Sequence, residues 1–76
     1  MIILDTVKTY TDYLNYPQTY QPNPENGYIK LSDYRYLVAI EGKDEYFIGL
    51  SDSQSEALRD VKNGEIVHII NLKINL

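Results

Sequence analysis

Histidine is the side chain that most often changes charge near neutral pH, and the chain contains one, His68. A catalytic histidine needs a positioned partner and a substrate pocket beside it. The candidate serines, Ser51, Ser53 and Ser55, flank a predicted helix start, where serine is typical of capping. His68 alternates with isoleucines and is expected to lie on the apolar face of a strand. We therefore expect no catalytic residue and do not expect an enzyme.

The sequence also lacks the residues that usually hold metals and cofactors. It has no cysteine, which excludes thiolate zinc sites, iron–sulfur clusters and disulfides. His68 has no second histidine as a companion ligand and would need carboxylates from elsewhere in the chain. The four glycines are isolated, so no phosphate-binding loop of the Walker or dinucleotide type is present. We expect no metal site and no cofactor.

Three acidic residues, Asp52, Glu56 and Asp60, follow one another at intervals of four, which would place them on one side of a helix. The helix dipole favours negative charge in the first turn, so Asp52 and Glu56 also have a structural explanation. Asp44 and Glu45, in a predicted turn, would extend this acidic surface. We expect these five residues to contact a basic partner.

The formal net charge of −4 is concentrated in one part of the chain. Seven acids and three bases lie between residues 41 and 65, and this segment therefore accounts for all of the net charge. Direct binding of nucleic acid requires a basic face that neutralises phosphates, and the sequence does not provide one. The expected partner is instead a protein with a basic surface.

Tyrosine is unusually frequent, with eight residues against one phenylalanine and no tryptophan. A tyrosine ring suits a half-buried position with a solvated hydroxyl, and tyrosine is enriched in protein interfaces. About half of the tyrosines are expected in the core: Tyr10, Tyr34 or Tyr36, and Tyr46. The interface candidates are those expected on an outer helix face and in a proline-rich loop: Tyr13, Tyr16, Tyr20 and Tyr28.

The N-terminal segment has apolar residues at helical spacing, which predicts a helix over about residues 3–15. The stripe consists of Ile3, Val7, Tyr10 and Leu14. Pro17 is expected to end this helix, because a proline disfavours helical geometry in the residue before it. A short strand over residues 2–4 is the alternative.

Residues 16–33 contain all three prolines and predict a surface loop. Asn26 and Gly27 are typical of a tight turn, since both accept positive φ. A short strand over 28–31, paired loosely with residues 19–21, would reduce the length of this loop.

Alternating apolar residues predict a strand over 34–41, a turn over 42–45 and a returning strand over 46–50. Ser53 to Glu56 then matches a capping box, in which the Ser53 hydroxyl and the Glu56 carboxylate bond each other's backbone N–H groups.

That capping box predicts a short helix over 54–62, and Asn63-Gly64 supplies its left-handed end. A final strand follows from about residue 65 to the end.

These elements predict one α+β domain over residues 1–76, in the order α-loop-β-β-α-β. A right-handed crossover would place the last strand beside the first and antiparallel to it. The sheet would have three strands, or four with the short strand near residue 28, and both helices would cover one face. If so, the other face would expose apolar residues that a homodimer could bury: Leu37, Ala39, Val67 and Ile69.

The function expected from these features is protein binding by a small acidic inhibitor or adaptor that occludes a basic, nucleic-acid-handling partner. Size and composition are typical of phage or mobile-element inhibitors of host defence, including anti-CRISPR proteins, and of toxin immunity proteins, classes that share no sequence. The alternative is a self-assembling structural subunit. The apolar runs are too short to span a membrane and no leader is recognised, so the expected location is the cytoplasm, that of the host if the protein is viral.

Overall fold

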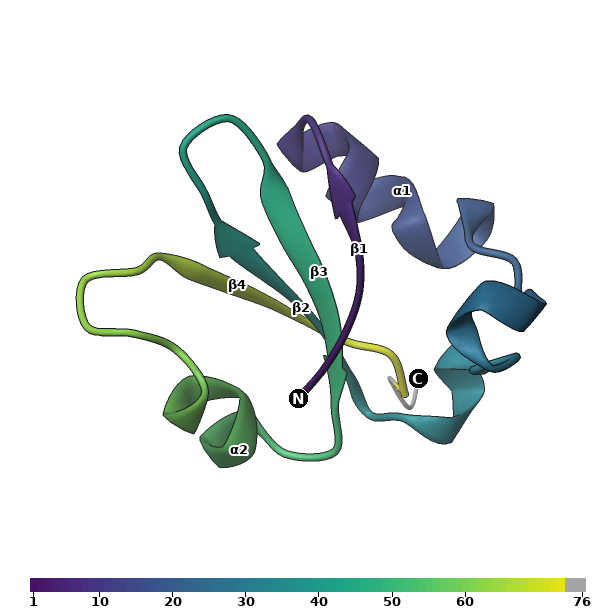
Figure 1. Cartoon of the computed structure of the whole chain (residues 1–76). Coiled ribbons are helices and arrows are strands. Elements are labelled where there is room, and N and C mark those ends of the chain that lie inside the picture. Colours follow the sequence, from purple (N-terminus) through teal and green to yellow (C-terminus); the bar gives the residue numbers. More distant parts are fainter. Residues whose placement is uncertain (74–76) are drawn as a thin grey trace.

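The computed structural model describes residues 1–73, which form a four-stranded antiparallel sheet with helices on both faces (Figure 1). The strand order across the sheet is β1-β3-β2-β4. In chain order the elements are β1 (Ile2–Val7), α1 (Tyr10–Thr19), the 3₁₀ turns η1 (Pro24–Asn26) and η2 (Leu31–Asp33), β2 (Tyr36–Glu41), β3 (Tyr46–Ser51), α2 (Gln54–Arg59) and β4 (Val67–Asn71). The α+β class is as predicted. No helix in this part of the chain is long and apolar enough to cross a membrane.

The predicted hairpin is confirmed. Strands β2 and β3 pair from Tyr36 with Ser51 to Glu41 with Tyr46, and the Gly42 N–H closes the turn by donating to the Glu45 carbonyl at 2.7 Å. Strand β4 pairs antiparallel with β2, as expected from the crossover. Part of the predicted last strand, positions 74–76, lies outside the described residues.

The N-terminal helix predicted over 3–15 is wrong, because the chain first forms strand β1. β-Branched residues favour an extended chain, and pairing with β3 satisfies the backbone. Helix α1 starts only after Thr9, whose hydroxyl accepts the Asp12 N–H at 3.1 Å. Pro17 lies inside this helix instead of ending it, and beyond it the Tyr20 N–H donates to the Tyr16 carbonyl at 2.9 Å.

The fourth strand is β1, and the short strand predicted over 28–31 does not form. Side-chain hydrogen bonds hold this segment in turns, since Asn23 and Asn26 cap each other's backbone N–H groups at 3.1 Å. Gly27 adopts φ 69°, the left-handed geometry expected of the turn, and Tyr28 follows with φ 57°.

Helix α2 begins as predicted, with the Ser53 hydroxyl accepting the Glu56 N–H at 3.1 Å. It ends at Arg59, earlier than the predicted 62, and Gly64 adopts its φ of 90° in a separate turn. The reciprocal half of the predicted capping box is absent among residues 1–73. The Ser53 N–H instead lies 3.4 Å from the Ser51 hydroxyl, which accepts it.

The prediction that both helices cover one face is wrong, since α1 and α2 pack on opposite faces (Figure 1). Strand β2 has buried apolar side chains at four consecutive positions, so both of its faces need cover. Under α1 the buried cluster is Tyr13, Tyr16, Leu37, Ala39, Ile48 and Leu50. Under α2 it is Val38, Ile40 and Ala57, with Val67 and Ile69 packed against them.

Because α1 and α2 cover opposite faces, the four residues predicted to form one bare apolar face for a homodimer do not share a face. Leu37 and Ala39 are fully buried under α1. Val67 and Ile69 pair with Ile40 and Val38 and so belong to the other face.

Candidate functional site

Two of the four tyrosines predicted to form an interface are core residues. Tyr13 is fully buried and Tyr16 is 6% exposed, so the predicted places of Tyr13 on an outer helix face and of Tyr16 in a surface loop are wrong. The Tyr13 hydroxyl donates to the backbone carbonyl of Leu37 at 2.7 Å and to that of His68 at 3.2 Å. The Tyr16 hydroxyl donates to Asp5 Oδ2 at 3.2 Å. The late start of α1 turns these two residues toward the sheet.

The other two interface candidates differ in exposure. Tyr20 is half-buried, and its hydroxyl donates to the Ile29 carbonyl at 2.6 Å while accepting Asn26 Nδ2 at 2.6 Å. Burial raises the pKa of Tyr20, as it does for Tyr13. Tyr28 is 62% exposed and remains available for contact.

Two of the three acids predicted to form a helical ridge, Glu56 and Asp60, lie close together at α2, and the third does not lie in the helix. Asp52 is exposed and precedes the helix, and Asp60 caps its other end. Asp60 Oδ2 and Glu56 Oε1 both accept from the Met1 ammonium, at 2.5 and 3.5 Å. The hydrogen bond that the ammonium donates to Asp60 is the main cause that raises its pKa. Glu56 and Asp60 therefore hold the N-terminal residue Met1 on the α2 face of the sheet.

The turn acids Asp44 and Glu45 are separated from α2 by the length of the hairpin (Figure 1). A strand rises about 3.4 Å per residue, so the six-residue strand β3 spans about 17 Å. The acids at the turn and those at α2 are thus two groups separated by about the length of β3.

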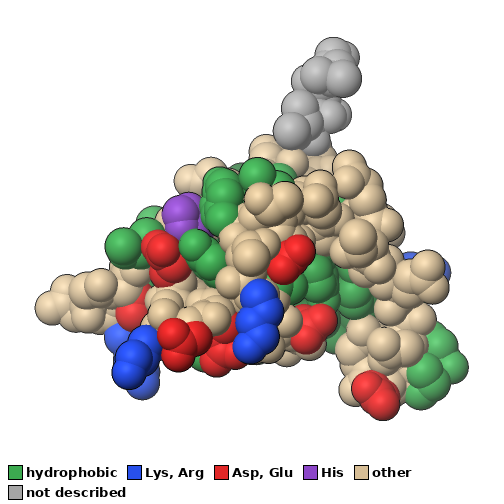
Figure 2. Space-filling model, turned by 90° about the horizontal axis from the view of Figure 1, so that it is seen from above, with side chains coloured by type: hydrophobic (Ala, Val, Ile, Leu, Met, Phe, Trp, Pro, Cys, Tyr) green, Lys and Arg blue, Asp and Glu red, His purple; other side chains and the backbone are tan. Residues whose placement is uncertain are grey.

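A cluster that the sequence did not indicate lies beside the turn acids. It comprises Tyr10 of α1, Glu41 of β2, Tyr46 of β3 and His68 of β4, and is called the hairpin-end cluster below. The His68 ring lies 4.9 Å from the ring of Tyr10 and 6.1 Å from that of Tyr46, centre to centre. Figure 2 shows the histidine at the surface next to hydrophobic and acidic side chains.

The Glu41 carboxylate joins two members of this cluster. Its Oε1 accepts from the Tyr46 hydroxyl at 3.4 Å, and its Oε2 lies 3.4 Å from His68 Nε2. Burial and the neighbouring carboxylate raise the pKa of Tyr46. His68 Nε2 is buried and forms no hydrogen bond within residues 1–73.

The hairpin-end cluster places an exposed aromatic ring beside a carboxylate and a histidine. Tyr10, expected in the core, is 42% exposed, and its ring lies against three neighbouring rings, those of Tyr13, Tyr46 and His68. Only the pairing of Glu41 with Tyr46 could have been derived from the sequence, because it follows from a hairpin with its turn at 42–45. Tyr10 and His68 come from distant parts of the chain, and only the fold brings them together.

The described residues contain no group of three or more histidine, aspartate or glutamate side chains that could hold a metal ion. Comparisons with protein-family models, with curated proteins and with solved structures found no match to this chain. The assignment of a site therefore depends on the geometry described above.

Proposed function

We propose that this chain is a small acidic protein-binding inhibitor or adaptor that occludes a basic, nucleic-acid-handling surface of another protein. The observation that carries the proposal is the exposed ring of Tyr10, which lies against Tyr46, the first residue after the acids of the β2–β3 turn. An aromatic ring that is already positioned loses little side-chain entropy on binding, and tyrosine is frequent among the residues that dominate interface energies.

The acids give this surface its preference for a basic partner. Glu41, Asp44 and Glu45 lie within five residues, with Lys43 as the single base among them. Such a group speeds association with a basic surface and does so less at high salt. An anti-defence inhibitor of the anti-CRISPR type, or an immunity-type protein, acts by blocking a partner in this way. The cytoplasm is the proposed location, since a chain without cysteine needs no oxidising compartment.

The test compares two charge-reversal variants with the same change in net charge. The first is Asp44→Lys with Glu45→Lys in the turn, and the control is Glu25→Lys with Asp33→Lys, which changes two exposed acids away from the turn. Each variant and the wild type are immobilised and exposed to lysate of the source cell at about 0.05 and 0.3 M salt. Captured proteins are quantified by mass spectrometry.

We expect the wild type and the control to capture a protein with a basic surface at low salt. The turn variant should capture it at least tenfold less, and higher salt should reduce capture by the wild type. Equal capture by all three proteins at both salt concentrations would contradict the proposal. Once the partner is identified, Tyr10→Ala should weaken binding by about 2 kcal/mol if the ring is a dominant contact.

One observation favours a self-assembling subunit as the second candidate. On the α2 face, Phe47 pairs with Ile40 and Ile40 pairs with Val67, which makes an apolar row across three strands. Phe47 is 36% exposed. Light scattering of the wild type over a range of concentrations distinguishes the two candidates, because a strict monomer at high concentration would remove the second.

A further inference from the structure

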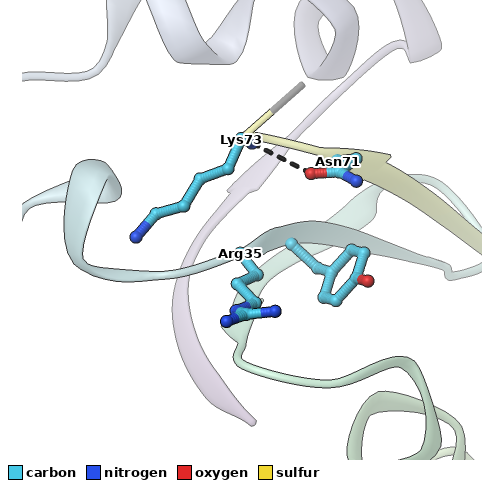
Figure 3. A pocket seen from close by; sticks show the side chains of 4 residues that line it. Arg35, Asn71 and Lys73 are labelled. Carbon is cyan, nitrogen blue, oxygen red and sulfur yellow. Dashed lines mark hydrogen bonds between the residues drawn. The ribbon is translucent and has the colours of Figure 1, made fainter. Parts of the chain in front are cut away.

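A hollow of about 260 Å³, drawn in Figure 3, is lined by residues at the start of β2 and the end of β4. It therefore lies at the other end of the sheet from the hairpin-end cluster. Its lining residues are Arg35, Tyr36, Asn71 and Lys73. Two of the four carry positive charge and none is acidic, in a chain whose net charge is −4. A second hollow of about 280 Å³ has the opposite character, because Asp5 and Glu25 line it and no cation does.

The backbone holds the four lining residues in register. Tyr36 pairs with Asn71 across the two strands, and the Leu72 N–H donates to the Arg35 carbonyl at 2.7 Å. The Lys73 N–H donates to Asn71 Oδ1 at 2.9 Å, as Figure 3 shows. This bond occupies the oxygen of the Asn71 amide and leaves its Nδ2 as a donor.

The side chains of the four lining residues carry mainly hydrogen-bond donors. They are the guanidinium of Arg35, the ammonium of Lys73, the Asn71 Nδ2 group and the Tyr36 hydroxyl. Within residues 1–73, no carboxylate forms an ion pair with Arg35 or Lys73. Two cations at one hollow repel each other, and an anion between them converts this repulsion into attraction.

We infer that this hollow binds a phosphate group, either free or as a monoester on a small molecule. Arginine matches phosphate oxygens with two parallel N–H donors, and lysine adds a compact positive charge. The volume is just below the range of about 300–1,000 Å³ typical of sites for larger organic ligands, which favours a small anion. The site is separate from the hairpin end, so the two proposals can fail independently.

The test is a titration of the whole chain with inorganic phosphate at constant ionic strength, followed by NMR of backbone and side-chain N–H groups. We expect saturable shifts at Arg35, Asn71 and Lys73 that sodium chloride does not produce. Arg35→Gln and Lys73→Gln should each weaken binding at least tenfold. Lys30→Gln, which removes an exposed charge outside the hollow, should leave binding unchanged.

Unchanged shifts elsewhere in the spectra of the variants show that the fold is retained. Equal shifts with chloride, or equal loss of binding in Lys30→Gln, would overturn the inference by showing only a general charge effect. Titration with a 5′-mononucleotide and with a short single-stranded oligonucleotide separates the sources of phosphate. Tighter binding of inorganic phosphate or of the mononucleotide supports the inference and identifies the free or esterified form, whereas a preference for the oligonucleotide would refute a small-molecule site.

Discussion

The buried hydroxyl of Tyr13 provides a direct test of the role of the tyrosines. Tyr13→Phe keeps the ring in the core and removes only the hydroxyl, which donates to the carbonyls of Leu37 at 2.7 Å and His68 at 3.2 Å. These carbonyls belong to neighbouring strands, β2 and β4, so the hydroxyl links α1 to both. Tyr16→Phe is the matched control, because its hydroxyl makes one bond of 3.2 Å to the exposed Asp5 side chain.

The size of the effect follows from the number and burial of these bonds. A typical hydrogen bond contributes about 0.5–1.5 kcal/mol net, so Tyr13→Phe should lower the free energy of unfolding by about 1–2 kcal/mol. For a domain of this size that loss corresponds to a fall in Tm of about 4–16 °C. Tyr16→Phe should cost about 0.5 kcal/mol, because the carboxylate that loses its partner can be solvated by water.

The assay is urea unfolding of the wild type and both variants, monitored by circular dichroism. The slope of the free energy against urea should be the same in all three, so that the midpoint reports stability alone. If Tyr13→Phe were as stable as the wild type, or no less stable than Tyr16→Phe, the hydroxyl would not be a buried link between helix and sheet. The assignment of Tyr13 to the core by its hydrogen bonds would then be wrong.

Two further predictions concern pH and helix capping. Burial raises the pKa of Tyr13 and Tyr16, so the folded chain keeps protons that the unfolded chain releases above about pH 10. Stability should therefore be intact below that pH and fall above it by about 1.4 kcal/mol per pH unit for each tyrosine, and urea midpoints that stay constant from pH 9 to 11 would argue against this. Ser53→Ala should cost about 1 kcal/mol in thermal or urea unfolding, because the hydroxyl caps α2. Ser55→Ala, which removes no backbone cap, should cost much less, and equal losses in the two variants would show that capping is not the cause.

Local patterns were sufficient for the central part of the chain. The hairpin of β2 and β3 alternates its side chains over a polar turn, and the start of α2 depends on the hydroxyl of Ser53, only three residues from the N–H that it accepts. The pairing of β4 with β2 also follows from the short connection through α2. These features depend on contacts between residues close in sequence, or on chain geometry that allows few alternatives.

The N-terminal segment shows where local patterns are ambiguous. Ile3, Val7 and Tyr10 have helical spacing, yet the first two also suit a strand, and their backbone forms the edge strand beside β3. This choice moves the start of the helix to Tyr10 and thereby turns Tyr13 inward. Pairing with a strand about 40 residues away outweighs the weak helix propensity of the segment.

The composition of the chain establishes a small acidic protein rich in tyrosine, without the ligands for a thiolate metal site, and its local patterns establish the hairpin and the capped helix. Packing alone assigns the individual side chains to core or surface, because this depends on which face each helix covers. The hairpin-end cluster shows the difference most clearly. Tyr10 and His68 are separated by most of the chain, and their rings meet because α1 and β4 pack at the same end of the sheet. No spacing in the sequence encodes a contact between elements whose positions are set by the burial of other residues.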